Sequence, residues 1–217
     1  MENQRRLKKD LFGEVVLRTH EIEPTILRDA GKARWWLRPI ARLLLRREAT
    51  ALAALEGLDG VPQLIEIKRN TLVRSYLAGK PLHEARPDDI LWFKAASRLL
   101  RQLHRAGVVH NDLAKEPNLL VRDNGGPALI DFQLAAHSLK RGRLFRIAAY
   151  EDLRHLLKHK RTYWPDRLTE RERHILTNPS PLSRAWMGMV KPVYMFVTRR
   201  IFGWEDREGA RDRGAVD

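Results

Sequence analysis

The chain has 217 residues, 43% of them apolar, which is enough for one domain with a core or for two small lobes around a cleft. It contains no cysteine, so disulfides, thiolate nucleophiles and cysteine-based metal sites are excluded. Lysine and arginine number 41 against 27 acidic residues, and the net charge of +14 favours negatively charged partners; the alternative is a basic surface without a dedicated partner. We find no zinc-finger spacing and no aromatic RNA-binding strand, so a nucleic-acid module is not expected. Residues 1–10 lack the apolar core of a secretory signal, which favours a cytoplasmic location.

The first third of the sequence predicts short strands and one helix. Runs of apolar and β-branched residues predict strands over 13–19, 24–28, 61–67 and 71–77. Between them, an apolar set at helical spacing predicts a helix that ends near Gly57: Leu43, Leu44, Ala51, Leu52 and Leu55. A cluster of helix- and strand-breaking residues at 78–81 then marks the expected boundary between an N-lobe of residues 1–78 and a C-lobe of residues 79–178.

The second lobe is predicted to open with a helix that stops at Gly107. Its expected buried stripe is Leu91, Ala95, Leu99, Leu100 and Leu103. A short buried strand, Val108-Val109, follows, and the turn sequence at 123–126 then predicts a hairpin between strands 119–121 and 128–130. This hairpin would place Asn118 and Asp131 at the open ends of adjacent antiparallel strands, although 13 positions separate them in the sequence.

The remainder is predicted to be helical. Leucines at 153, 156 and 157 indicate a helix over 150–159, and Thr169 with Glu172 forms a capping box for another. Residues 179–217 form an amphipathic segment and a charged tail without an apolar run long enough to cross a bilayer. The segment either packs on the second lobe or lies on an anionic membrane surface, and both interpretations remain open.

Two short motifs carry the chemistry: residues 110–118, read as HNDLAKEPN, and residues 129–133, read as LIDFQ. Phosphoryl transfer from ATP requires a carboxylate that orients the attacking hydroxyl and oxygen ligands that hold Mg²⁺ against the phosphates. Asp112 fits the first role, while Asn118 and Asp131 fit the second. The motifs therefore predict a kinase that uses ATP and Mg²⁺.

On these residues, the chain from about residue 12 to 176 resembles the protein-kinase-like superfamily. The similarity is to its compact bacterial members, the RIO-type kinases and the lipopolysaccharide-core sugar (Kdo or heptose) kinases. The resemblance implies an α+β, bilobal fold with a small β-rich N-lobe that holds one helix and a helical C-lobe. It implies that Asp112 is catalytic, that Asn118 and Asp131 bind metal, and that Lys115 contacts the transferred phosphate.

The same resemblance assigns residues that hold the nucleotide. Arg28 stands where the family has a phosphate-binding lysine, with Lys32 as a rival, and Glu48 stands where the family has the partner of that lysine. The alternative for Glu48 is a solvated helix face. Tyr76 and Leu77 would receive adenine at the hinge. Two further residues have expected structural roles. Asp152 resembles a buried acid that steadies the catalytic loop; the alternative is an ordinary acid near a helix N-terminus. His110 is expected to pack beneath Asp131.

Four departures from the family pattern bear on activity. The catalytic loop is one residue longer, with Ala114 as the insertion, and Asn111 replaces the loop arginine. Gly13 is the single glycine available to cover the phosphates, and Arg28 replaces lysine, with a bulkier, forked cation. The leading hypothesis is phosphoryl transfer to a hydroxyl, on a lipid-linked or phosphorylated sugar at the cytoplasmic face of the membrane or on a protein serine or threonine. The alternatives are a pseudokinase that regulates a partner and an RNA-associated factor.

Overall fold

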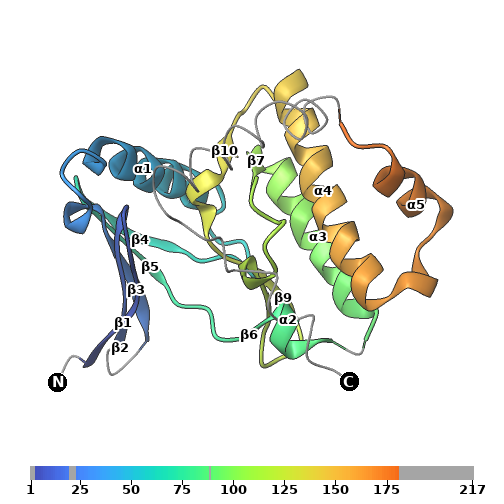
Figure 1. The fold of residues 1–217 in the computed structure, drawn as a ribbon, viewed down its shortest axis with the longest axis horizontal. Coiled ribbons are helices and arrows are strands. Elements are labelled where there is room, and N and C mark those ends of the chain that lie inside the picture. Colours follow the sequence, from blue (N-terminus) through green and yellow to red (C-terminus); the bar gives the residue numbers. More distant parts are fainter. Residues whose placement is uncertain (1–2, 20–22, 88, 181–217) are drawn as a thin grey trace, which may run out of the picture.

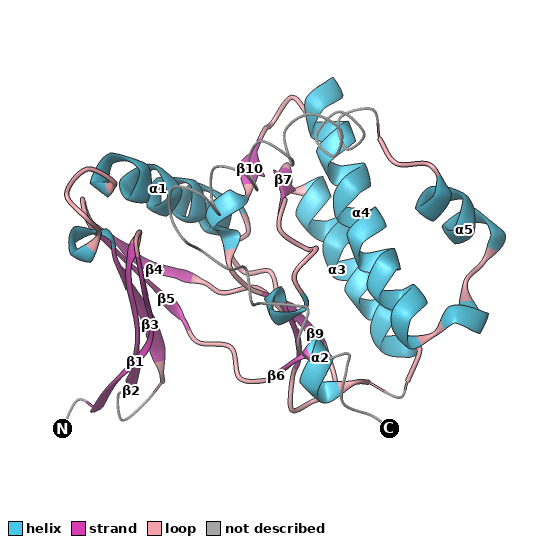
Figure 2. Cartoon of the chain, viewed as in Figure 1, coloured by secondary structure: helices cyan, strands magenta, loops and turns pink. Residues whose placement is uncertain are grey.

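The computed structural model describes residues 3–19, 23–87 and 89–180, and it has the expected α+β, bilobal architecture (Figure 1). Five antiparallel strands form the sheet of the N-lobe in the order β1-β2-β3-β5-β4. Their bounds are β1 Asn3–Asp10, β2 Gly13–Thr19, β3 Thr25–Asp29, β4 Leu64–Ile67 and β5 Thr71–Ser75. In Figure 2 this sheet forms one side of the molecule, and the long helices α3 and α4 form the other.

The strand β1 was not predicted, because its eight residues are almost all polar or charged and do not alternate with apolar ones. It pairs with β2 along its whole length, with Asn3 opposite Thr19 and Asp10 opposite Gly13. Gly13 has a φ of +133°, and a Cβ there would lie 2.3 Å from the carbonyl oxygen of Asp29. The packing of β2 on the end of β3 therefore requires glycine at this position, independently of any contact between Gly13 and the phosphates of a nucleotide.

Helix α1, Arg38–Ala54, lies against the sheet and also reaches the C-lobe (Figure 1). Arg47 on this helix donates from Nε to the carbonyl of Ala135 (3.1 Å) and from a terminal nitrogen to the carbonyl of Leu134 (2.9 Å). The predicted helix is present, and of the apolar residues in it Leu45 is buried whereas Leu43 is 56% exposed. The helix is thus rotated so that Glu48 points inward.

A second, three-stranded sheet lies in the C-lobe and begins directly after the segment that connects the lobes. Strand β6, Lys80–Pro81, pairs with β8, Leu119–Val121, which pairs with β9, Pro127–Leu129. The β8–β9 hairpin has Leu119 opposite Leu129, as the turn sequence predicts. Strands β7, Val108–Val109, and β10, Ala136–His137, form a separate antiparallel pair.

Helices make up the rest of the C-lobe: α2 Leu82–Ala85, α3 Leu91–Arg105, α4 Arg143–Tyr163 and α5 Glu170–Thr177. Short 3-10 turns span η1 Ala30–Lys32, η2 Glu116–Asn118, η3 Phe132–Leu134 and η4 Pro165–Arg167. The predicted stripe on α3 is shifted, because Leu91 is 56% exposed while Trp92, Phe93 and Ala96 are buried. The predicted helix over 150–159 is longer at both ends, because residues 143–149 and 160–163 continue it without a breaking residue.

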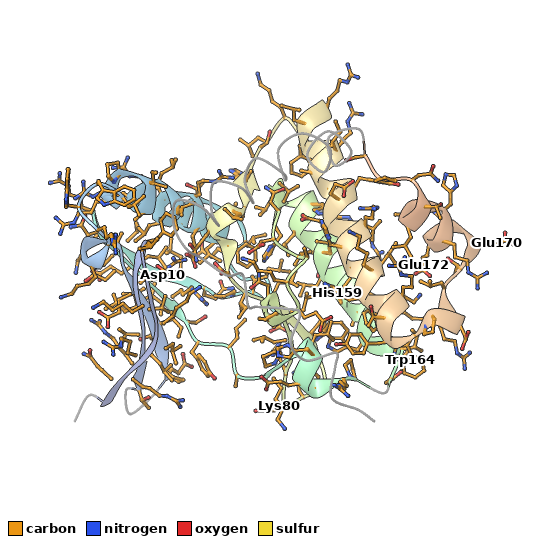
Figure 3. All side chains as sticks on the ribbon, in the orientation of Figure 1. Asp10, Lys80, His159, Trp164, Glu170 and Glu172 are labelled. Atoms are coloured by element: carbon orange, nitrogen blue, oxygen red, sulfur yellow. The ribbon has the colours of Figure 1, made fainter. Side chains whose placement is uncertain are left out.

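The main core lies where α3, α4 and the β8–β9 hairpin meet, and its fully buried side chains include Phe93, Leu103, Leu119 and Phe132. The predicted capping box of α5 is present, and Glu172 also accepts two hydrogen bonds from Lys160 across to α4 (Figure 3). Among the described helices none is long and apolar enough to cross a bilayer. Residues 181–217, which hold most of the predicted amphipathic segment, lie outside the described residues.

Candidate active site

The loop after β7 carries Asp112 and Lys115, the η2 turn that follows ends at Asn118, and the side chains of Lys115 and Asn118 both contact that of Asp112. Lys115 Nζ lies 3.1 Å from Asp112 Oδ2, and Asn118 Nδ2 donates to the same oxygen at 3.0 Å. Asn118 also donates to the carbonyl of Asp112 at 2.9 Å, which closes the loop on itself. Asn118 is 5% exposed, whereas the Lys115 side chain is 57% exposed. The loop therefore holds Asp112 in one orientation and leaves Lys115 at the surface.

Asp152 fixes the start of this loop from below. Its two carboxylate oxygens accept the backbone N–H groups of His110 (2.7 Å) and Asn111 (2.8 Å). Asn111 has a φ of +62°, a left-handed conformation that asparagine tolerates better than most residues. Asp152 is 1% exposed and lies well inside α4, so the alternative interpretation as an ordinary acid near a helix N-terminus is wrong.

His110 has the structural role that the sequence analysis gave it. Its Nε2 lies 2.9 Å from the carbonyl oxygen of Ile130, and its ring centroid lies 4.7 Å from that of Phe132. Since Ile130 and Phe132 flank Asp131, the histidine ties the catalytic loop to the segment that carries this acid. The side chain is fully buried and does not face the site.

A second anchor joins the loop to α4 and was missed at the sequence level. His159, to which the sequence analysis gave no role, is 7% exposed and is labelled in Figure 3; its Nε2 lies 2.8 Å from the carbonyl oxygen of Leu113. Glu116 accepts a hydrogen bond from Tyr163 at 2.7 Å and lies 3.5 Å from His159 Nδ1. The hydrogen bond with His159 lowers the pKa of Glu116, against the opposing effect of burial, and the bond from Tyr163 lowers it further.

Asp131 follows the end of β9 with a φ of +65°. The N–H of Ile130 donates to the carbonyl of Asn118 at 3.0 Å, so the hairpin brings the backbones next to Asn118 and Asp131 into contact. Gln133 Nε2 donates to Asp131 Oδ1 at 2.7 Å. Gln133 thus holds the carboxylate of Asp131 directly, a contact that the sequence did not predict.

The predicted pair between Arg28 and Glu48 is present, with Arg28 Nη1 2.7 Å from Glu48 Oε2. The same nitrogen lies 3.8 Å from Asp131 Oδ1, so Arg28 connects the sheet, α1 and the Asp131 segment. The side chain of Glu48 is 0% exposed, which excludes its alternative interpretation as a solvated helix face. The rival cation Lys32 is exposed on η1.

Arg74 on β5 is a buried member of this cluster that sequence reasoning missed. Its Nε lies 3.1 Å from Glu48 Oε1, although neither atom has an aligned hydrogen-bond partner in the described part of the chain. Desolvation by burial lowers the pKa of Arg74, while the charge of Glu48 opposes the shift. The signal was the alternation along β5, which places Arg74 on the same face as the buried Leu72.

Tyr76 and Leu77 lie in the segment that joins β5 to β6 and therefore connects the lobes. The N–H of Tyr76 donates to the carbonyl of Pro24 at 3.2 Å, and its side chain is 37% exposed. Their place between the lobes is the one that the resemblance implies, and their contact with adenine remains a prediction.

The donor set fits a magnesium ion bound together with phosphates. Because Asn118 uses its amide nitrogen for Asp112, its amide oxygen remains for a cation, and Asp131 adds a carboxylate that is 34% exposed. Mg²⁺ is typically held by one or two protein oxygens, substrate phosphates and water. Within the described ranges no three histidine or acidic side chains form a metal cluster of their own. Any such ion would therefore depend on the nucleotide for further ligands.

Comparison with known proteins identifies the family. The model of the RIO domain matches residues 22–171, which is well over half of the chain. The chain belongs to the RIO domain family. This confirms the predicted kinase family, and ATP with Mg²⁺ is what such a family generally uses.

Two individual proteins illustrate the relationship. The Rio2 kinase from Chaetomium thermophilum has the same fold, with a TM-score of 0.61 at 16% identity over 93% of this chain and 72% of that one. A curated protein of Streptomyces coelicolor, described as a probable SapB synthase, is 32% identical over 123 residues, which cover 46% of this chain. The chain spans only 13% of the length of that relative.

Proposed function

We propose that this RIO-family kinase transfers the terminal phosphoryl group of ATP to a hydroxyl of its acceptor. The observation that carries the proposal is the convergence of Asp112, Asn118 and Asp131 from one loop and two strand ends. Phosphoryl transfer is catalysed mainly by positioning and by electrostatic stabilisation, and a fixed carboxylate beside two oxygen ligands meets that requirement.

Each residue of the cluster has a proposed task. Asp112 accepts the proton of the acceptor hydroxyl and orients it, and Lys115, 3.1 Å away, supplies positive charge to the transferring group. Arg28, held by Glu48, neutralises the inner phosphates. Asn118 and Asp131 would hold Mg²⁺, which offsets the charge of the phosphates when bound. Tyr76 and Leu77 would contact the adenine, which would lie between the two lobes. We propose that these lobes comprise residues 1–78 and 79–178.

For the acceptor, we propose a sugar hydroxyl on a molecule that already carries phosphate, as in a lipopolysaccharide core. The support is the family resemblance and the net charge of +14, which attracts anionic acceptors. A serine or threonine of a polypeptide is the second choice. The match to the probable SapB synthase covers too little of that protein to select between them.

A screen with labelled ATP tests the proposal. The full chain is incubated with phosphorylated sugars, lipid-linked sugars and peptides, and the label is followed into product. We expect transfer to one class and its loss in Asp112→Ala. Equal transfer by wild type and Asp112→Ala would refute the assignment of the catalytic carboxylate.

One observation favours a second candidate, a nucleotide-binding module without catalysis. Asp131 Oδ1 is already taken by Gln133 at 2.7 Å, with Arg28 at 3.8 Å, so protein groups compete with a metal for this carboxylate. A module of this kind would be stabilised by ATP equally with and without Mg²⁺, whereas the enzyme gains additional thermal stability when Mg²⁺ is present.

A further inference from the structure

A basic pocket lies outside the proposed active site, between the C-terminal end of α3 and the N-terminal end of α4. Its volume is about 530 Å³, and the residues that line it are Arg101, His104, Arg105, Lys140, Arg141, Phe145 and Arg146. In Figure 1 these two helix ends lie together at one end of the C-lobe, next to β7 and β10 and away from the η2 turn that carries Asn118. The pocket is therefore separate from the nucleotide cleft.

The charge of this pocket is uncompensated. Five of its seven lining residues are arginine or lysine, and the lining contains no acidic residue. Arg101, Arg105, Lys140, Arg141 and Arg146 are all exposed, and in the described part of the chain no ion pair joins any of them to a carboxylate. Like charges held this close repel one another, so an anion between them lowers the electrostatic free energy of the folded chain.

The helix that forms one wall adds to the positive potential. The first turn of α4 contains no acidic residue, and its N-cap, Gly142, has no side chain to cap the free N–H groups. A helix N-terminus carries a partial positive charge and is normally complemented by an acid. Here lysine and arginine surround it instead, which raises the local potential further.

The size and chemistry of the pocket indicate the class of ligand. A volume of about 530 Å³ is that of a small-molecule site, since typical ligand pockets range from roughly 300 to 1,000 Å³. Arginine binds phosphate through two parallel hydrogen bonds, and four arginines are present. Several cations around one hollow match an anion with more than one phosphate group.

We propose that this pocket is a second anion site, which binds a compact ligand with two or more phosphates. Its floor is connected to the catalytic loop, because His104 Nε2 lies 3.3 Å from Asp152 Oδ2, the oxygen that accepts the N–H of His110. A ligand in the pocket contacts His104, which in turn contacts Asp152, the support of the loop, and it does not contact the reacting groups. The proposal does not depend on the phosphotransfer activity.

Isothermal titration of the full chain with tripolyphosphate tests the site, with the nucleotide cleft saturated by ADP and Mg²⁺ and the salt held at about 150 mM. We expect one saturable site. The double substitution Arg101→Gln with Arg146→Gln should weaken it by about tenfold or more. The matched control, Arg171→Gln with Arg173→Gln, removes the same charge from exposed positions on α5 and should change the affinity by less than about twofold.

Absence of saturable binding, or equal weakening by the two double variants, would overturn the proposal. Circular dichroism of both variants shows whether each is folded. Vesicles that contain a phosphatidylinositol phosphate, whose head group carries two phosphates, distinguish the sources of the phosphate. If the chain binds the vesicles, and this binding is lost in the pocket variant and displaced by tripolyphosphate, the ligand is a lipid head group. If the chain binds tripolyphosphate but not the vesicles, the ligand is a free molecule. RNA that binds the pocket when tripolyphosphate does not would overturn the compact-ligand proposal in favour of nucleic acid.

Discussion

Glu48 provides the sharpest test of how the N-lobe is built. It is 0% exposed and lies between two guanidinium groups, Arg28 at 2.7 Å and Arg74 at 3.1 Å. The substitution Glu48→Gln keeps the shape of the side chain and removes the buried negative charge that pairs with both of them. Breaking a buried ion pair by removing one partner typically costs about 3–5 kcal/mol. That is a large part of the roughly 5–15 kcal/mol that stabilises an ordinary domain.

The cost should depend on Arg74. The substitution Arg74→Met removes a buried cation whose Nε has no aligned hydrogen-bond partner, so alone it should cost less than about 2 kcal/mol. In that background Glu48→Gln leaves only Arg28 without its partner, and its cost should fall by about 1–2 kcal/mol.

Urea unfolding of the full chain, followed by tryptophan fluorescence, measures these free energies. The control is Glu66→Gln on β4, whose pair with Lys68 is exposed and should contribute about 0.5 kcal/mol or less. If Glu48→Gln cost no more than this control, the buried cluster would not stabilise the lobe and the reasoning would be refuted.

Three further predictions concern the catalytic loop, pH and one turn. Asp152→Asn should lower the free energy of unfolding, measured in urea, by about 2–3 kcal/mol, because the two loop N–H groups lose a charged acceptor. It should also lower the turnover rate more than the affinity for ATP, and an unchanged turnover rate would contradict this. Burial lowers the pKa of His155 from 6.5 to about 4, so the folded chain prefers the neutral ring. Stability should therefore fall from pH 6.5 toward pH 4, by at most about 1.4 kcal/mol per pH unit, and His155→Gln should flatten the unfolding curve in that window. Gly60→Ala should lower the free energy of unfolding by about 1–3 kcal/mol, because the φ of Gly60 is +84° and a Cβ would lie 2.9 Å from the carbonyl of Pro127. The control is Gly57→Ala, where φ is +74° but a Cβ would meet open space, and it should lower the melting temperature less than Gly60→Ala does.

Local sequence determined the catalytic hairpin well. The turn at 123–126 and the apolar runs beside it fix the pairing of β8 and β9, so the meeting of Asn118 with the Asp131 segment could be inferred from spacing. The family resemblance placed Lys115 and Asn118 in the same catalytic loop as Asp112, but their contacts with Asp112 became visible only in the structure.

Contacts between distant segments were less accessible. The charged strand β1 has no apolar alternation and forms because β2 offers it an edge to pair with. The alternation along β5 indicates that Arg74 is buried, but not that it lies beside Glu48. His159 and the pocket that contains His104 depend on how separate elements pack, which no local pattern encodes. The helical periods gave α1 and α3 but not their rotation, so Leu91 was assigned to the buried face of α3 although it is exposed.

Binding of ATP with and without Mg²⁺ tests the central claim most directly. Titration calorimetry is performed on the wild type and on Asp131→Asn, which is close to the native residue in shape and removes the carboxylate charge. We expect Mg²⁺ to strengthen ATP binding to the wild type by about tenfold or more, and to have little effect on the variant. Equal dependence on Mg²⁺ in both proteins would contradict the account, because the metal-nucleotide site would then not involve the end of β9.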